Sequence, residues 1–339
     1  MIIKKNKKYH FSKKKRNKSK LSHKKLKRGK RKLFLKLSII LILFLLNFYS
    51  IFQDLFYENF YSKNKTKVCL CVIAKKENLY IEYFIEYYKQ LGYDHIYLYD
   101  NNDKRGEKVE DLIKKYIDEN LVTLIDYGGL KGNNRNSPQM RAYYDCYEKH
   151  SKEYDWLSFF DIDEYLMLKP KGIKIQRFLE NKRYKDCPIV KINWLMFSDN
   201  GQISYENKPI TKRFPKPSLN QNAGIHVKSI MRGNMSYHKL EKTYNAHYIY
   251  NGIKSCSSSG KFVEGTCFND PPDYEYATLN HYVKTITEYI QKLKRGFFSN
   301  NPNLYPERLK RKFNVFFEMN DKTEEKIKIF NSAFNTNFK

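Results

Sequence analysis

The stretch KVCLCVIAKKENLYIEYFIEYYKQLGYDHIYLYD, residues 67–100, decides the fold. Residues 67–74 form an apolar run rich in β-branched and small side chains, which is typical of a buried parallel strand. In residues 78–92 the apolar side chains recur every three or four positions, and the stretch ends at Gly92, as many helices end at a glycine. Residues 95–100 are again strand-like. A strand, a helix and a strand in this order predict a right-handed crossover between parallel strands.

The alternation of strands and helices continues to about residue 170, after which strands are separated by long polar connections. Ser137 and Pro138 are the residue types that begin helices. The sequence therefore predicts an α/β domain with a Rossmann-like, mostly parallel sheet. We expect further helices at 108–120, 138–150, 283–296 and 321–334, and further strands at 121–127, 156–160, 188–197, 225–231 and 245–250.

The formal net charge of +28 is concentrated at the N-terminus. Residues 1–36 contain 18 Lys or Arg and no acidic residue, so the rest of the chain carries 46 basic and 36 acidic side chains. A basic tail of this kind is an orientation signal that contacts lipid head groups, a nuclear address or a nucleic-acid arm. Few aromatic side chains lie between its lysines, which argues against the nucleic-acid arm.

Residues 33–53 are mostly apolar and long enough to span a bilayer. A buried core helix and an interfacial anchor are the alternatives. Because the lysines precede this segment, the positive-inside rule predicts a single-pass type II protein, with residues 1–32 in the cytoplasm and 54–66 as a stem on the other side. In a eukaryote that side would be the Golgi lumen, where the sequons at Asn64 and Asn234 are glycan acceptors.

The cysteines contain no C-x-x-C pair, so a structural zinc site is not expected. Cys69 and Cys71 point to the same face of a predicted strand, and we interpret them as small core residues. Cys256 and Cys267 flank a Gly- and Ser-rich segment and would close a loop in an oxidising compartment.

Acidic and amide side chains follow three of the predicted parallel strands, where ligands of α/β sheets bind. Asp161 and Asp163 are separated by one residue, so both carboxylates face one side and offer hard oxygen ligands to a divalent cation and its diphosphate. An ordinary acidic turn is the alternative. Glu164 either contacts the ligand or supports the pair. The polar groups at the strand ends are 75–78, 100–102 and 161–163.

Four segments in this order resemble glycosyltransferase family 92 and related family-2-like enzymes, over roughly residues 68–296. The resemblance implies a GT-A fold, a sugar-nucleotide donor, a divalent metal, usually manganese, and inversion at the anomeric carbon. The segments are CVIAKKENLYIEYFIEYYKQLGYDHIYLYDNN (71–102), FFDIDEYL (159–166), NWLMFSDNG (193–201) and LNHYVKTITEYIQKLKRG (279–296).

Carried over by position, the resemblance assigns Asp161, Asp163 and His281 to the metal and the diphosphate. For His281 a core or loop position is the alternative, and for Gln139 and Arg141 an exposed helix surface is. The donor contacts would come from Glu77, Asn78, Asp100, Asn101, Gln139, Arg141, Lys284 and Arg295.

Inversion requires a general base for the acceptor hydroxyl, usually a carboxylate. Asp199 is the first candidate and Glu264 the second. Ser198 and Asp199 replace the small residues that the family resemblance leads us to expect. Trp194, in the same segment, either stacks on a sugar or packs in the core.

The sequence therefore predicts a membrane-anchored glycosyltransferase with a catalytic domain at 67–300 and a helical extension at 301–339. It would use Mn²⁺ or another divalent metal to move a hexose, galactose being one candidate, from a UDP-sugar to a glycan acceptor. The alternatives are a nucleic-acid or membrane-surface binding protein led by the basic tail, and an inactive carbohydrate-binding relative. The intact D-x-D argues against the inactive relative, and no nucleic-acid partner is expected.

Overall fold

The computed structural model describes residues 65–131, 137–235, 254–264, 267–295 and 306–339, together with residues 34, 37, 38, 41, 44 and 45. Contacts divide the chain into two compact units, Met1–Lys65 and Thr66–Lys339, and the second contains the sheet. Within these described ranges no helix combines the length and the apolar character needed to cross a membrane. Most of the predicted span at 33–53 lies outside them.

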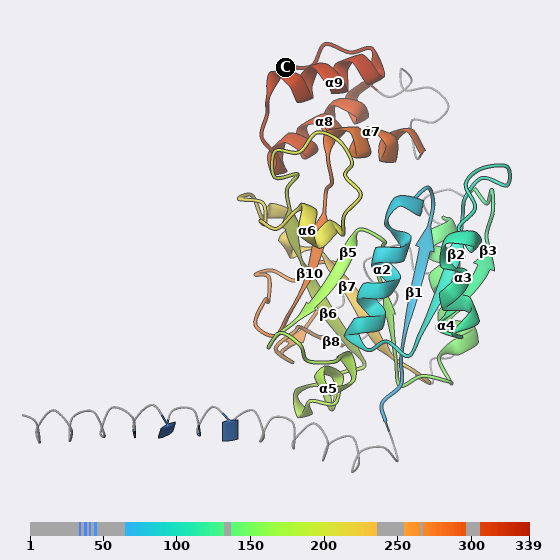
Figure 1. The fold of residues 1–339 in the computed structure, drawn as a ribbon, viewed down its shortest axis with the longest axis vertical. Coiled ribbons are helices and arrows are strands. Elements are labelled where there is room, and N and C mark those ends of the chain that lie inside the picture. Colours follow the sequence, from blue (N-terminus) through green and yellow to red (C-terminus); the bar gives the residue numbers. More distant parts are fainter. Residues whose placement is uncertain are drawn as a thin grey trace, which may run out of the picture. The chain divides into compact units, whose positions relative to one another are not determined.

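The first half of the sheet follows the predicted pattern (Figure 1). Four parallel strands lie in the order β3-β2-β1-β4. Helices α2 and α3 pack on one face of these strands and α4 on the other. The apolar side chains of α2 and α3 belong to one core cluster, and those of α4 belong to a second. The elements are β1 (Val68–Ala74), α2 (Asn78–Leu91), β2 (His95–Asp100), α3 (Glu110–Asp118), β3 (Val122–Asp126), α4 (Pro138–His150) and β4 (Trp156–Phe159).

The end of α2 and the start of α4 have the capping residues that the sequence predicted. Gly92 ends α2 with φ 101°, in the left-handed region that favours glycine. At the start of α4, the Ser137 side chain accepts a hydrogen bond from the Met140 backbone N–H, and Pro138 occupies the first turn.

The second half of the sheet is mixed, so the prediction of a mostly parallel sheet is wrong beyond β4. Strand β7 is antiparallel to both β4 and β6, β10 is parallel to β6, and β5 is antiparallel to β10. In the described parts of these connections the helices, α5 and α6, are only five and four residues long, shorter than the usual crossover helix between parallel strands. The elements are β5 (Glu164–Leu168), α5 (Ile175–Leu179), β6 (Ile189–Phe197), α6 (Ile210–Arg213), β7 (Val227–Arg232), β8 (Ser255–Cys256), β9 (Phe262–Val263) and β10 (Ala277–Tyr282). The strand expected at 245–250 lies outside the described residues.

Three C-terminal helices pack together beside the sheet. Phe313, Phe316 and Phe330 form a cluster with the apolar face of α7 and with Met196 of β6. Residues 306–339 therefore belong to the same compact unit as the sheet. The helices are α7 (Ile286–Arg295), α8 (Pro306–Met319) and α9 (Glu324–Phe334).

The cysteine predictions are wrong in their pairing. Cys71 is bonded to Cys146 of α4, and Cys256 is bonded to Cys187 instead of Cys267. Spacing along the chain did not show these pairs, because 75 and 69 residues separate the partners. Cys69 is a free, buried cysteine, as expected for a core residue.

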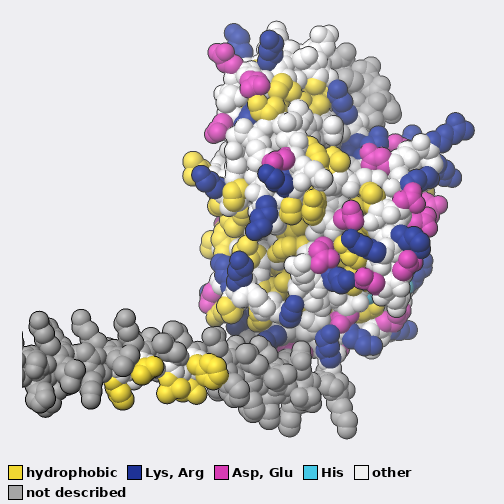
Figure 2. Space-filling view, in the orientation of Figure 1, with side chains coloured by type: hydrophobic (Ala, Val, Ile, Leu, Met, Phe, Trp, Pro, Cys, Tyr) yellow, Lys and Arg dark blue, Asp and Glu magenta, His cyan; other side chains and the backbone are white. Residues whose placement is uncertain are grey.

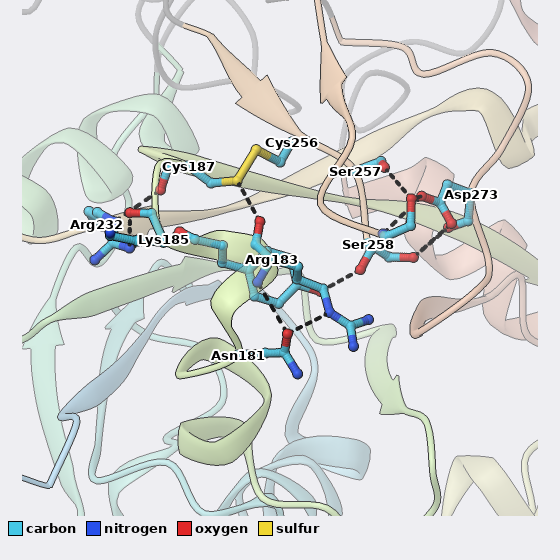
Figure 3. The surroundings of a disulfide bond; sticks show 11 residues. Asn181, Arg183, Lys185, Cys187, Arg232, Cys256, Ser257, Ser258 and Asp273 are labelled. Carbon is cyan, nitrogen blue, oxygen red and sulfur yellow. Dashed lines mark hydrogen bonds between the residues drawn. A yellow bond between two sulfur atoms is a disulfide. The ribbon is translucent and has the colours of Figure 1, made fainter.

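The Cys187–Cys256 bond lies in a dense polar network (Figure 3). The Arg232 guanidinium donates to the Cys187 carbonyl at 3.0 Å and to the Tyr184 carbonyl at 2.8 Å. On the other side, the Ser258 hydroxyl donates to the Asp273 carboxylate at 2.9 Å. The bond thus joins the residues just before β6 to β8.

The surface agrees with the division of charge along the chain. On the face shown in Figure 2, Lys and Arg side chains of the domain are interspersed with Asp and Glu. This pattern is expected for a domain that is only mildly basic.

Candidate active site

The candidate site lies where β1, β2 and β4 end. The Asn102 side chain accepts from the Lys76 backbone N–H at 2.6 Å, which ties the loop after β2 to the loop after β1. Asn101 donates its amide to the Tyr127 carbonyl at 2.7 Å, and Asn78 donates to the Lys108 carbonyl at 2.9 Å. These amides build the loops around Asp100, whose pKa is raised by burial.

Asp161 is held by three donors. Its Oδ1 accepts from Tyr143 Oη at 2.8 Å and from the Gln139 side-chain amide, both on α4. Its Oδ2 accepts from Lys228 Nζ at 2.9 Å. Burial alone would raise the pKa of Asp161, but Lys228 and Tyr143 hold it below its usual value. The structure thus brings the predicted Gln139 to Asp161 and adds two residues that the sequence reasoning missed.

Glu164 is fully buried beneath Asp161. Its Oε2 accepts from the Asp161 backbone N–H at 2.8 Å and lies 3.4 Å from Lys228 Nζ, and its Oε1 accepts from Trp194 Nε1 at 2.8 Å. Burial raises the pKa of Glu164 to about 8, although Lys228 opposes the shift. Because this carboxylate is fully buried and accepts from the Asp161 backbone, Glu164 supports the turn that carries the two aspartates.

Asp163 points to a different set of partners. Lys292 of α7 forms an ion pair with its Oδ2, and His281 Nε2 of β10 lies 3.8 Å from its Oδ1. Burial would raise the pKa of Asp163, but Lys292, His281 and Lys284 hold it well below its usual range. Lys292 is 43% exposed, so it can move to another anion.

A second ion cluster lies at the end of β1. The Glu77 carboxylate pairs with Lys284 Nζ at 2.7 Å and with the Arg295 guanidinium. Arg295 also donates to the Lys76 carbonyl at 2.9 Å. The structure therefore brings together three residues that the sequence assigned to the donor, from parts of the chain more than 200 residues apart.

Other predicted residues lie apart from these clusters. The buried Asp199 carboxylate accepts from the Gly201 N–H at 2.9 Å and lies 2.7 Å from Lys326 Nζ of α9. Glu264 is exposed, and its backbone carbonyl accepts from Lys191. The prediction that either residue is the general base is not tested by these contacts. Arg141 donates to the Lys131 carbonyl at 2.7 Å.

Sequence signals existed for two of the missed residues. Lys228 is a charge inside the apolar run of β7, a position where lysine is found only when it is paired. Lys292 precedes Arg295 by three residues, so both side chains lie on one face of α7. Tyr143 had no such signal, because tyrosines occur throughout the chain.

A divalent cation fits Asp163 and His281 best. The two side chains lie 3.8 Å apart, a separation that two ligands of one cation can adopt, and His281 Nδ1 is buried with no hydrogen-bond partner. Asp161 fits less well as a direct ligand, because its oxygens already accept three hydrogen bonds. In the part of the chain that the structure describes, no three His, Cys, Asp or Glu side chains are grouped to hold a metal, so phosphate oxygens would have to complete the site.

Comparison with known proteins gives a family match over most of the chain. The sequence model of glycosyltransferase family 92 matches residues 64–336. A glycosyltransferase family 92 protein of Ricinus communis is 21% identical over 117 residues, which are 34% of this chain and 20% of that protein. The match therefore spans about a fifth of that relative's length.

Solved structures with similar elements include the 1–349 fragment of TarS from S. aureus. It is 12% identical, with 80% of this chain and 71% of that chain covered and a TM-score of 0.34. The same fragment in complex with UDP is 13% identical, with the same coverage and a TM-score of 0.35. Its complex with UDP-GlcNAc is 12% identical, with 80% and 72% covered and a TM-score of 0.33. TM-scores below 0.5 do not establish a common fold.

Proposed function

The chain belongs to glycosyltransferase family 92, and we propose that it is a metal-dependent, inverting enzyme that moves a hexose from a UDP-sugar to a glycan acceptor. Galactose is one candidate hexose. The observation that carries the proposal is the set of carboxylates formed by the D-x-D-E turn and Glu77, which pair with four cationic side chains at the ends of the strands. The cations are Lys228, Lys284, Lys292 and Arg295.

A GT-A architecture is part of this proposal. The parallel order β3-β2-β1-β4 gives a nucleotide half, and the antiparallel β7 after β4 begins an acceptor half. The D-x-D-E turn lies between the two halves, directly after β4. This position supports a site in which the donor lies over the first half and the acceptor over the second.

The cations have a chemical role in this proposal. A departing nucleoside diphosphate gains negative charge, and preorganised cations stabilise it most in a site shielded from water. Lys292 is bound to Asp163 and partly exposed, so it is suited to exchange the carboxylate for a phosphate. Lys284 and Arg295 both form ion pairs with Glu77, at the end of β1. Asp100, at the end of β2, is the proposed nucleoside contact.

A metal would be held by Asp163 and His281 together with donor phosphates. When bound, it supplies Lewis-acid stabilisation to the diphosphate. Asp161 would then orient Asp163 and the donor, since it is itself fixed by Tyr143 and Lys228. Each of these residues acts by position and charge, which is the main contribution expected from protein groups in such a transfer.

We further propose that the domain lies on the non-cytoplasmic side of a membrane, anchored by residues 33–53. Two disulfides support an oxidising compartment, such as the Golgi lumen of a eukaryote. Asn234, in one of the two sequons, is exposed, which agrees with glycosylation there.

Hydrolysis of UDP-hexoses by the purified full-length chain tests the proposal. Activity should require Mn²⁺ or another divalent cation, and Asp163→Asn should lower it at least a hundredfold. Asp118→Asn is the matched control, because Asp118 is an exposed aspartate paired with a lysine on α3. Activity that is the same with and without a metal chelator, or full activity of the Asp163→Asn variant, would contradict the mechanism.

A further inference from the structure

Four aromatic rings form a continuous row that begins beside Asp163. The ring centroids of His281 and Trp194 are 4.2 Å apart. Those of Trp194 and His226 are 4.9 Å apart, as are those of His226 and Phe268. We call these four residues the aromatic row. Phe268, the member farthest from Asp163 along the row, is 43% exposed.

Backbone pairing fixes the row. Trp194 N–H donates to the His226 carbonyl at 2.9 Å, and His226 forms an isolated antiparallel bridge with Phe268. The His226 ring is oriented by a 3.0 Å contact between its Nδ1 and the Ala223 carbonyl. The rings are thus presented in one arrangement, so that a ligand would not have to order them on binding.

The row lies on the side of the site away from the proposed nucleoside contact, Asp100. It runs over β6 and β10 and the segments next to them, whereas Asp100 and Glu77 lie at the ends of β2 and β1, in the other half of the sheet. A nucleobase at the proposed nucleoside contact would therefore lie in the half of the sheet that the row does not cover. The molecule that could contact the row is therefore the acceptor.

The chemistry of the row suits a sugar ring. An aromatic face packs against the C–H face of a pyranose, and imidazole nitrogens exchange hydrogen bonds with its hydroxyls. Pockets that bind small ligands combine aromatic surface with a few polar groups in this way. Two of the four rings here are histidines, so both kinds of contact are present.

We propose that the aromatic row is an acceptor subsite, in which Phe268 and His226 bind a neutral sugar of the glycan next to the sugar that receives the hexose. This inference rests on the proposed function, because it takes the direction of the acceptor from it. It adds the place at which the acceptor is recognised and the class of group that is recognised there.

Binding of the fluorescently labelled full-length chain to an array of neutral oligosaccharides tests the inference. The wild type should bind at least one glycan, and Phe268→Ala should weaken that binding about tenfold, the size expected for loss of one aromatic stack. Phe268→Tyr, which keeps the ring, should retain most of it. Phe262→Ala is the matched control, because Phe262 is 60% exposed on β9 and outside the row.

The thermal midpoint of Phe268→Ala should match that of Phe262→Ala, which separates lost recognition from lost folding. Binding by Phe268→Ala equal to the wild type, or no binding of the wild type to any neutral glycan, overturns the inference. Glycan binding through Phe268 without hydrolysis of any UDP-hexose would keep the aromatic row as a glycan-binding site but would overturn both the proposed function and the acceptor role of the row.

Discussion

Lys228 Nζ lies 2.9 Å from Asp161 Oδ2, and none of the Lys228 side chain is exposed to solvent. The same ammonium lies 3.4 Å from Glu164 Oε2. One buried cation thus serves two carboxylates of the D-x-D-E turn. Removing this lysine would take away the cation that the two carboxylates share.

Lys228→Met should lower the free energy of unfolding by about 3–5 kcal/mol, because it removes the buried cation that pairs with both Asp161 and Glu164. Adding Glu164→Gln should recover part of the loss. Urea unfolding measures both. Lys114→Met, at an exposed i,i+4 pair with Asp118, should cause no measurable change. A Lys228→Met protein as stable as the wild type would show that the cluster does not depend on its cation.

Lys292→Met should weaken UDP binding about tenfold, since one charge-assisted contact to phosphate is lost. Its effect on stability should be small, because Lys292 is partly exposed. Isothermal titration calorimetry with UDP measures the affinity, with Lys114→Met as the control for net charge. Unchanged affinity would mean that Lys292 stays on Asp163 when the donor binds.

Mn²⁺ should bind at least ten times more tightly in the presence of UDP than in its absence. Asp163 and His281 provide two ligands, and the phosphates would supply the others. Electron paramagnetic resonance of free Mn²⁺ measures binding in both conditions. His281→Ala should abolish the gain from UDP. Tight binding without UDP would point to a complete protein site instead.

The buried pair of Arg213 and Glu288 predicts a pH dependence of stability. Burial would raise the pKa of Glu288, but hydrogen bonds from Arg213, Thr285 and Tyr80 hold it below its usual value. Since the folded pKa is below the unfolded one of about 4.3, the stabilisation is complete above that pH and is lost as pH falls through the folded pKa.

Glu288→Gln should therefore destabilise the protein by about 3 kcal/mol at pH 7. The difference from the wild type should be the same at pH 5.5 and should shrink below about pH 4. Urea unfolding at each pH measures it, with Glu324→Gln on the exposed first turn of α9 as the control. A difference that changes between pH 7 and 5.5 would assign the titration to another group.

Cys187→Ser with Cys256→Ser should lower the free energy of unfolding by about 4 kcal/mol, the entropy expected for a closed loop of 69 residues. Thermal unfolding in non-reducing buffer measures the loss. Cys267→Ser is the matched control, because Cys267 is a free cysteine. Equal stability of the double variant and the control would mean that the bond adds nothing to the folded state.

The first half of the fold could be predicted from the sequence because its signals are local. The apolar period of α2, Gly92 at its end and Ser137 before α4 each act within a few residues. The second half could not, because β7 and β10 reach their places through long connections that carry no such signal. Asp161 and Asp163 were found from their position after a strand. Lys228 and Tyr143 were not, since only the packing of distant elements brings them to Asp161.

The Cys71–Cys146 bond has a consequence for how the protein must be handled. Cys146 is three residues from Tyr143 on α4, the helix that also carries Gln139, and both of these side chains hold Asp161. The disulfide to β1 therefore fixes the helix whose side chains hydrogen-bond to Asp161, the first aspartate of the turn. Protein made or assayed under reducing conditions would keep every residue of the site, but it would lack the cross-link that aligns them.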